Sequence, residues 1–113
     1  MRVEFLVEIE IRLPSDLAPA SRADLLEAEQ ARGVELAEAG TIRAIWRVPG
    51  RLANRGIWST ADATDLHAAI ASLPLWPYMD VAVTPLAAHA LAGSCLGIPA
   101  AVGGEATSER RLS

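Results

Sequence analysis

The sequence predicts an α+β domain in which one antiparallel sheet carries two helices on the same face. The chain has 113 residues, 51% of them hydrophobic, which is the size and composition of a single domain with its own core. Stretches in which apolar and polar residues alternate, the pattern of half-buried strands, are separated by stretches with helical spacing. In chain order these stretches read β-α-β-β-α-β.

The first strand and the first helix have the clearest patterns. Every odd position of residues 3–11 is apolar and three even positions are glutamates, so this segment is a strand with one buried face. Pro19 suits the first turn of the helix that follows. That helix runs to about Ala39, where Gly40 provides the C-terminal stop.

A hairpin is predicted in the middle of the chain. Residues 41–48 alternate again, Pro49-Gly50 makes a turn, and residues 52–58 form the returning strand, so the two strands pair antiparallel. The alternation places Ile42 and Trp46 on the same face.

The second helix is short and amphipathic. Residues 59–62 offer capping side chains at its start. Its apolar residues recur at helical spacing: Leu66, Ile70 and Leu73. Val81 and Val83 suit a short last strand, after which Pro85 and an alanine-rich stretch lead away. This order of elements is that of the ferredoxin-like fold, a split βαβ arrangement with both helices on one face of the sheet.

Composition excludes several classes of partner. A net charge of −4 opposes binding to nucleic acid or to an anionic membrane, because either partner needs a dominant basic patch. A small molecule or another protein remains. Cys95, the single cysteine, cannot form an internal disulfide, and no leader-like segment or long apolar span is present, so we expect the cytoplasm. His67 and His89 lack the close spacing of metal ligands, and no metal site is predicted.

Residues 93–113 differ in composition from the domain that we expect to span residues 1–92. They contain a Gly-Gly pair, isolated charges and few large apolar groups, which is typical of a flexible tail. A second interpretation applies to residues 87–91, whose apolar side chains could instead reach onto a neighbouring subunit.

Glu29 is the first candidate for chemistry. Measured around the axis of the first helix, Glu29 lies within about 20–40° of Leu25 and Leu36, which are on the side that faces the sheet. Its carboxylate therefore faces the sheet as well. Burial raises the pKa of a carboxyl group, which can then take and return a proton near neutral pH. The structural alternative is an ion pair with Arg32, three residues along the helix. The remaining helix surface carries solvated charges at Glu27, Glu35 and Glu38.

Four arginines lie close together around the predicted hairpin: Arg43, Arg47, Arg51 and Arg55. Arg43 and Arg47 are four positions apart and so share one face of a regular strand. In an acidic chain, one or two of these guanidinium groups could hold a small carboxylate substrate through bidentate hydrogen bonds. The alternative is structural, with the arginines acting as solvated sheet residues or as partners for the glutamates of the first strand.

Asn54 is a poor strand former within the third strand. If it points toward Glu29, its amide could stabilise the oxyanion that develops when a proton leaves a carbon next to a carbonyl. Turn chemistry near the hairpin is the alternative. Four aromatic residues are interpreted as core or subunit-contact residues: Trp46, Trp58, Trp76 and Tyr78.

Two prolines fix the backbone around a Trp and a Tyr in the segment LPLWPYMD at residues 73–80. This segment resembles the LPLFPYMD segment found at the same place in muconolactone Δ-isomerases. Further motifs of the resemblance are Arg12-Leu13-Pro14, Gly40-Thr41, Ile45-Trp46-Arg47 and Ala53-Asn54. The resemblance covers about residues 3–90, and the joint order and spacing of its motifs make it specific.

The resemblance implies a fold, an assembly and a reaction. Members of the family have the ferredoxin-like fold, form intertwined dimers that assemble into decamers, and use no metal or organic cofactor. They convert muconolactone to 3-oxoadipate enol-lactone in aromatic degradation, by a proton shuttle across three carbons. A small carboxylate lactone is therefore the expected partner, besides further copies of the chain itself.

By the same resemblance, Glu29 aligns with the family's proposed base and Asn54 with its companion asparagine. The expected substrate contacts are Phe5, Arg43, Arg47, Arg51 and Leu52, with Arg47 or Arg51 receiving the substrate carboxylate. The chain departs from the family at Leu52, where a tyrosine is proposed to orient the lactone, and at Arg51, where a histidine is typical. Loss of the hydroxyl favours a second hypothesis, an isomerase or cyclase acting on a larger, less polar enolisable compound. A third is a non-catalytic ligand-binding or assembly module.

Overall fold

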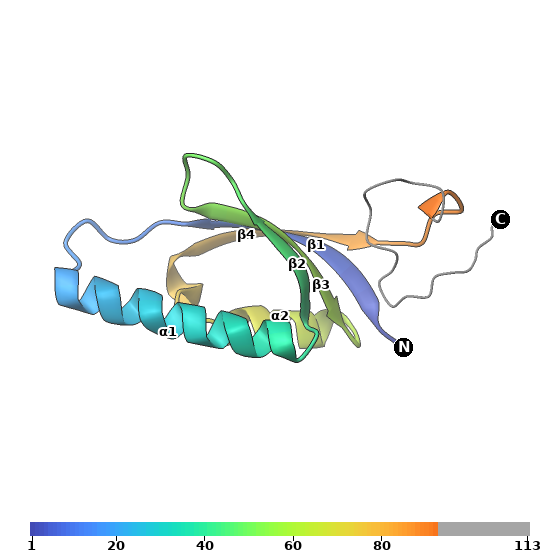
Figure 1. Cartoon of the computed structure of the whole chain (residues 1–113), viewed down its shortest axis with the longest axis horizontal. Coiled ribbons are helices and arrows are strands. Elements are labelled where there is room, and N and C mark those ends of the chain that lie inside the picture. The colour runs from blue at the N-terminus through green and yellow to red at the C-terminus, as the bar shows by residue number, and fades with distance from the viewer. Residues whose placement is uncertain (93–113) are drawn as a thin grey trace.

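The computed structural model describes residues 1–92. Its elements are β1 (Val3–Ile11), α1 (Pro19–Glu38), β2 (Ile42–Arg47), β3 (Ala53–Thr60), α2 (Ala63–Ala71), the 3₁₀ turn η1 (Trp76–Tyr78) and β4 (Met79–Leu86). All strand pairs are antiparallel, in the order β2-β3-β1-β4. Both helices lie on one side of this sheet (Figure 1). This is the predicted ferredoxin-like arrangement, and the predicted tail at residues 93–113 lies outside the described residues.

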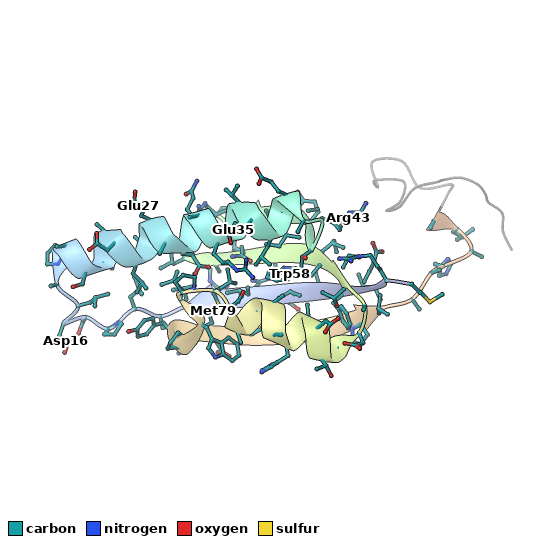
Figure 2. All side chains as sticks on the ribbon, turned by 90° about the horizontal axis from the view of Figure 1, so that it is seen from below. Asp16, Glu27, Glu35, Arg43, Trp58 and Met79 are labelled. Carbon is teal, nitrogen blue, oxygen red and sulfur yellow. The ribbon has the colours of Figure 1, made fainter. Side chains whose placement is uncertain are left out.

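The core lies between the sheet and the two helices. Phe5, Val7 and Ile9 of β1 are buried in it, together with residues of both helices. Trp58 of β3 is 1% exposed, and from the helix side it is seen between α1 and α2 (Figure 2). We call this side of the sheet the helix face. The other side, which carries the even-numbered residues of β1, is the open face.

A register shift near the start of β2 interrupts its alternation. Ile42 lies opposite Trp58 on the helix face, but Trp46 lies opposite Arg55 on the open face. Directly paired residues of antiparallel strands share a face. The prediction that Ile42 and Trp46 share a face is therefore wrong, because one extra residue in a strand exchanges the two faces beyond it.

The same shift bears on Arg43 and Arg47. Arg47 lies opposite Asn54, and Asn54 lies opposite Ile9 of the core, so Arg47 projects from the helix face. Arg43 is the extra residue at the shift, so the strand pairing assigns it to neither face. The prediction that Arg43 and Arg47 share one face assumed a regular strand, and the strand is not regular between them.

The first helix begins and ends close to the predicted positions. Pro19 is its first residue, and Gly40 follows it with a φ of 82°, in the left-handed region that glycine adopts without strain. Leu36 is the buried residue of α1, so this helix packs lightly on the sheet. Within residues 1–92, none of the helices is both long enough and apolar enough to span a membrane.

The ends of the later elements follow from local chemistry. The side chain of Asp62 caps α2 by accepting a hydrogen bond from the Asp65 backbone N–H (2.8 Å). β3 begins one residue later than predicted, so Leu52 lies in the turn before it. β4 is longer than predicted because it continues through Pro85. A proline is tolerated there because β4 is an edge strand, where a missing N–H can face the free edge.

Candidate active site

Glu29 lies near the middle of α1 and is half-buried. Its Oε1 atom accepts a hydrogen bond from the backbone N–H of Leu75 (2.9 Å), in the loop between α2 and η1. The predicted alternative, an ion pair with Arg32, is not formed. The Arg32 guanidinium instead binds the carboxylate of Glu35 (2.8 Å) and the hydroxyl of Ser72 (2.9 Å). Glu29 is thus a half-buried carboxylate held by an uncharged N–H group.

Burial sets the acidity of Glu29. Loss of water around the carboxylate raises its pKa above the ordinary value of 4.5, and this effect outweighs the Leu75 hydrogen bond, which lowers the pKa. A carboxyl group with a raised pKa is a stronger base than a solvated one and still releases its proton readily. Glu29 therefore has the chemistry needed to take a proton from carbon and return it.

Asn54 projects from the helix face of β3, opposite Ile9 of β1 and Arg47 of β2. Its side-chain oxygen is buried and has no hydrogen-bond partner among the described residues. The indole N–H of Trp58, further along the same face, is likewise buried with no partner in this part of the chain. Buried polar groups are usually paired. Two unpaired groups on one face of one strand therefore mark a place where a polar ligand could bind.

Gly56 lies between these two residues on β3. A Cβ atom at this position would come 3.3 Å from Nε1 of Trp58 and 2.9 Å from the backbone oxygen of Ala44, so the indole nitrogen lies over the glycine. Sequence reasoning missed both Gly56 and the Trp58 N–H. The signal was present, because Asn54, Gly56 and Trp58 alternate along one strand, and glycine inside a strand often marks a close approach.

The arginines divide between the two faces of the sheet. Arg51 and Arg55 bind glutamates of β1 on the open face, and Arg55 Nε lies 3.1 Å from Oε1 of Glu8. These two arginines fit the structural alternative. Within residues 1–92, Arg43 and Arg47 have no ion pair. Arg47 projects from the helix face.

An open apolar pocket of about 400 Å³ lies between α2 and β4. Its lining includes Phe5, Leu66, Ile70, Trp76, Val81 and Val83. His67 also lines it and packs edge-on against Trp76, with ring centroids 5.6 Å apart. Phe5, a predicted substrate contact, thus borders a pocket, whereas Leu52 lies in the turn and is 39% exposed. Trp76, the first residue of η1, lines the pocket and directly follows Leu75, whose N–H binds Glu29.

The fold and the site together define a class of protein. A small ferredoxin-like domain carries a half-buried carboxylate of raised pKa, an amide whose oxygen is buried and unpaired, and a guanidinium that has no ion pair among residues 1–92. These are the groups that an acid–base isomerase uses on a small carboxylate substrate. The chain matches the family described as Muconolactone delta-isomerase over residues 3–92, and it belongs to that family.

Individual relatives agree with this assignment. Muconolactone Delta-isomerase 2 of Acinetobacter lwoffii is 40% identical over 86 residues, which cover 76% of this chain and 90% of the relative. Muconolactone Delta-isomerase of Cupriavidus pinatubonensis is 36% identical over 85 residues, which cover 75% of this chain and 92% of that relative. A crystal structure of muconolactone isomerase matches with a TM-score of 0.74 at 30% identity, covering 96% of this chain and 99% of that one. The predicted fold and the predicted class, an intramolecular isomerase, are confirmed.

Proposed function

We propose that this isomerase acts on muconolactone, moving the lactone double bond to give 3-oxoadipate enol-lactone, with Glu29 as the proton-transferring base. The observation that carries the proposal is the Glu29 carboxylate, which is half-buried, has a raised pKa and is held by an N–H group rather than by a cation. The relatives, which are muconolactone isomerases, indicate the substrate.

The reaction moves one proton across three carbons. Glu29 removes the proton from the γ carbon of the unsaturated lactone, and the electrons of that C–H bond move into the ring to form a dienolate with its charge on the carbonyl oxygen. The same carboxyl group then delivers the proton to the α carbon, which leaves the double bond between the β and γ carbons. No atom is gained or lost, and one base serves both steps.

Two further groups fit the charges of this substrate. The Asn54 amide, whose oxygen is buried and unpaired, can turn to present its N–H to the dienolate oxygen and stabilise the charge as it develops. Arg47, its neighbour across the strand pair, can hold the substrate carboxylate with two parallel hydrogen bonds. We assign Arg47 rather than Arg51, because Arg51 is already paired with Glu10 on the open face.

Incubation of muconolactone in deuterated water tests this proposal. The wild type should return the substrate's own proton to the α carbon, with deuterium entering only where the protonated Glu29 exchanges with solvent before the second step. Glu29→Gln should be slower by about 10²- to 10⁴-fold, the usual effect of losing a general base. Glu27→Gln is the matched control, since Glu27 lies on the same helix, is exposed and projects outward (Figure 2); it should match the wild type. Equal turnover by wild type and Glu29→Gln would remove Glu29 from the mechanism.

A larger, less polar enolisable substrate is the second candidate, and the apolar pocket favours it. The pocket volume of about 400 Å³ is within the range of small-molecule sites. In this second proposal an apolar substituent of the substrate enters the pocket, whose lining includes Trp76, the residue after the Glu29-binding Leu75. Values of kcat/KM for muconolactone and for alkyl- or aryl-substituted lactones separate the candidates, because a preference for muconolactone excludes the second.

We also propose that the chain self-associates through the open face, as an intertwined dimer and as a decamer built from such dimers. This face carries the exposed side chains of Trp46 (55%) on β2 and Leu86 (38%) on β4, and exposed large apolar groups of this kind are suited to subunit contacts. Sedimentation velocity measures the number of subunits, and a monomer at every concentration would contradict the proposal. The cytoplasm remains the predicted compartment.

A further inference from the structure

The loop at residues 73–78, which binds Glu29, has a single backbone donor to spare. The N–H groups of Trp76 and Tyr78 bind carbonyl groups within the loop (2.9 and 2.8 Å), and that of Leu73 binds the carbonyl of Ile70 in α2 (3.1 Å). The two prolines have no N–H to donate. The N–H of Leu75 is left, and it binds Oε1 of Glu29, 46 residues away along the chain (2.9 Å).

Packing and the prolines hold this donor in place. Leu73 is 5% exposed and Leu75 is 1% exposed, so both side chains anchor the loop in the interior. Pro74 and Pro77 fix their own φ angles and restrict the residues before them. The loop therefore has few other conformations, and the Leu75 N–H is fixed in its direction toward α1.

The hydrogen bond fixes one oxygen of the carboxylate and leaves the other available. Within residues 1–92, the one hydrogen bond made by the Glu29 side chain is that from Leu75 to Oε1. A glutamate side chain has several rotatable bonds, and ordering it costs conformational entropy. A base that attacks a C–H bond gains rate when it is already held near the reacting atom, and the Leu75 N–H provides such a hold.

We infer that the Leu75 amide is a positioning group for the reaction, binding Oε1 of Glu29 so that Oε2 is the atom that takes the proton from the substrate. This inference rests on the proposed role of Glu29 as the base. It also gives the prolines at positions 74 and 77 a purpose beyond packing, which is to keep the donor still. Because the same hydrogen bond lowers the pKa of Glu29, its loss has a signature in pH-dependent measurements.

Nuclear magnetic resonance on the wild-type chain tests the contact directly. The amide resonance of Leu75 should shift with pH and share its midpoint with the carboxyl carbon of Glu29. Glu29→Gln keeps an acceptor oxygen but cannot ionise, so it should abolish this shift. A Leu75 amide resonance that stays constant while Glu29 titrates would overturn the inference, and this measurement requires no altered backbone.

Replacement of the Leu75 amide by an ester, in the full chain, removes the N–H and keeps the side chain. We expect kcat to fall about tenfold and KM to change by less than about twofold, because the Glu29 carboxylate is no longer oriented. The acid limb of kcat/KM should move to higher pH, because the pKa of Glu29 rises when the hydrogen bond is lost. An ester at Trp76 is the matched control: it removes a hydrogen bond of the same loop that does not reach Glu29, and should leave the acid limb unmoved. A Leu75 ester with an unmoved acid limb and unchanged kcat would overturn the inference.

The positioning inference and the proposed function fail in different ways. If Glu29→Gln is inactive while the Leu75 ester behaves like the wild type, the positioning inference alone is wrong. If Glu29→Gln is as active as the wild type, the assignment of Glu29 as the base is wrong, and the catalytic role of the Leu75 amide falls with it.

Discussion

Arg47 of β2 lies directly opposite Asn54 of β3, and both side chains project from the helix face of the sheet. The register shift near the start of β2 produces this pairing, because a regular strand would turn Arg47 toward the open face. One extra residue in a strand thus turns an exposed cation to the side of the sheet that carries the Asn54 amide and the helices.

Substitution of Arg47 should weaken substrate binding more than it slows the chemical step. A hydrogen bond to a charged group contributes about 1.5–3 kcal/mol, so Arg47→Gln should raise KM by about 10- to 100-fold, with a smaller effect on kcat. Arg55→Gln is the matched control, since Arg55 pairs with Glu8 on the open face and should leave KM unchanged. Steady-state kinetics with muconolactone decide the matter, and equal KM values for Arg47→Gln and the wild type would exclude Arg47 as the carboxylate site.

Activity should fall on the acid side of the pH profile with a midpoint above 4.5. The base must be ionised to take a proton, and burial raises the pKa of Glu29 above that ordinary value. The pH dependence of kcat/KM reports the pKa of the free enzyme. A midpoint at or below 4.5 would point to an exposed carboxylate and contradict the assignment of Glu29.

Glu29 should also make the stability of the fold depend on pH. Its pKa is higher in the folded chain than the ordinary value of 4.5, so the folded state binds more protons between the two values and loses stability as pH rises through that window. Glu29→Gln cannot titrate, and its free energy of unfolding relative to the wild type should therefore rise across the window. Urea unfolding at a series of pH values measures this, and a constant difference would show that Glu29 has the same pKa folded and unfolded.

Comparison of Glu29→Ala with Glu29→Gln distinguishes the loss of the hydrogen bond to Leu75 from the loss of the negative charge. Glu29→Ala leaves the Leu75 N–H without its acceptor next to a side chain that is 1% exposed. The free energy of unfolding should be about 1–3 kcal/mol lower than that of Glu29→Gln, the usual cost of an unsatisfied buried donor. Equal stabilities of the two variants would indicate that water replaces the carboxylate.

Two glycine substitutions should act in opposite directions. In Gly56→Ala the new methyl group would lie 2.9 Å from the backbone oxygen of Ala44, so we expect a loss of about 1–3 kcal/mol in stability. Gly33→Ala is the control, because nothing lies within 4 Å of its added Cβ in α1, and a gain of about 0.5–1 kcal/mol is expected. Thermal unfolding measures both. A stable Gly56→Ala variant would mean that β2 and β3 can separate at this point.

The elements with long regular patterns could be predicted from the sequence, and the irregular ones could not. The nine-residue alternation of β1 and the proline and glycine that bound α1 are local signals, and both elements lie close to their predicted ranges. The register shift in β2 leaves no mark in composition, so alternation assigned Trp46 and Arg47 to the wrong faces. The extension of β4 through Pro85 depends on its position at the edge of the sheet, which only the complete fold determines.

In the candidate site, the helical periodicity of the sequence predicted the inward position of Glu29 but not the group that binds it. Helical geometry placed Glu29 on the inward stripe, while the donor that binds it is 46 residues away and is a backbone group, which residue type does not reveal. Whether Arg32 would pair with Glu29 or with Glu35 depended on side-chain directions that spacing alone leaves open. Likewise, the pairing of Arg51 and Arg55 with glutamates of β1 required the strand register.

Both outer strands of the sheet are poor templates for a further strand. β4 contains Pro85, which cannot donate a backbone hydrogen bond, and β2 carries the register shift, which distorts the spacing of its free N–H and C=O groups. Natural proteins use both devices to stop edge-to-edge aggregation. Growth into amyloid-like ribbons is therefore disfavoured at either side, and the edges of this sheet do not favour contacts between copies that lengthen it.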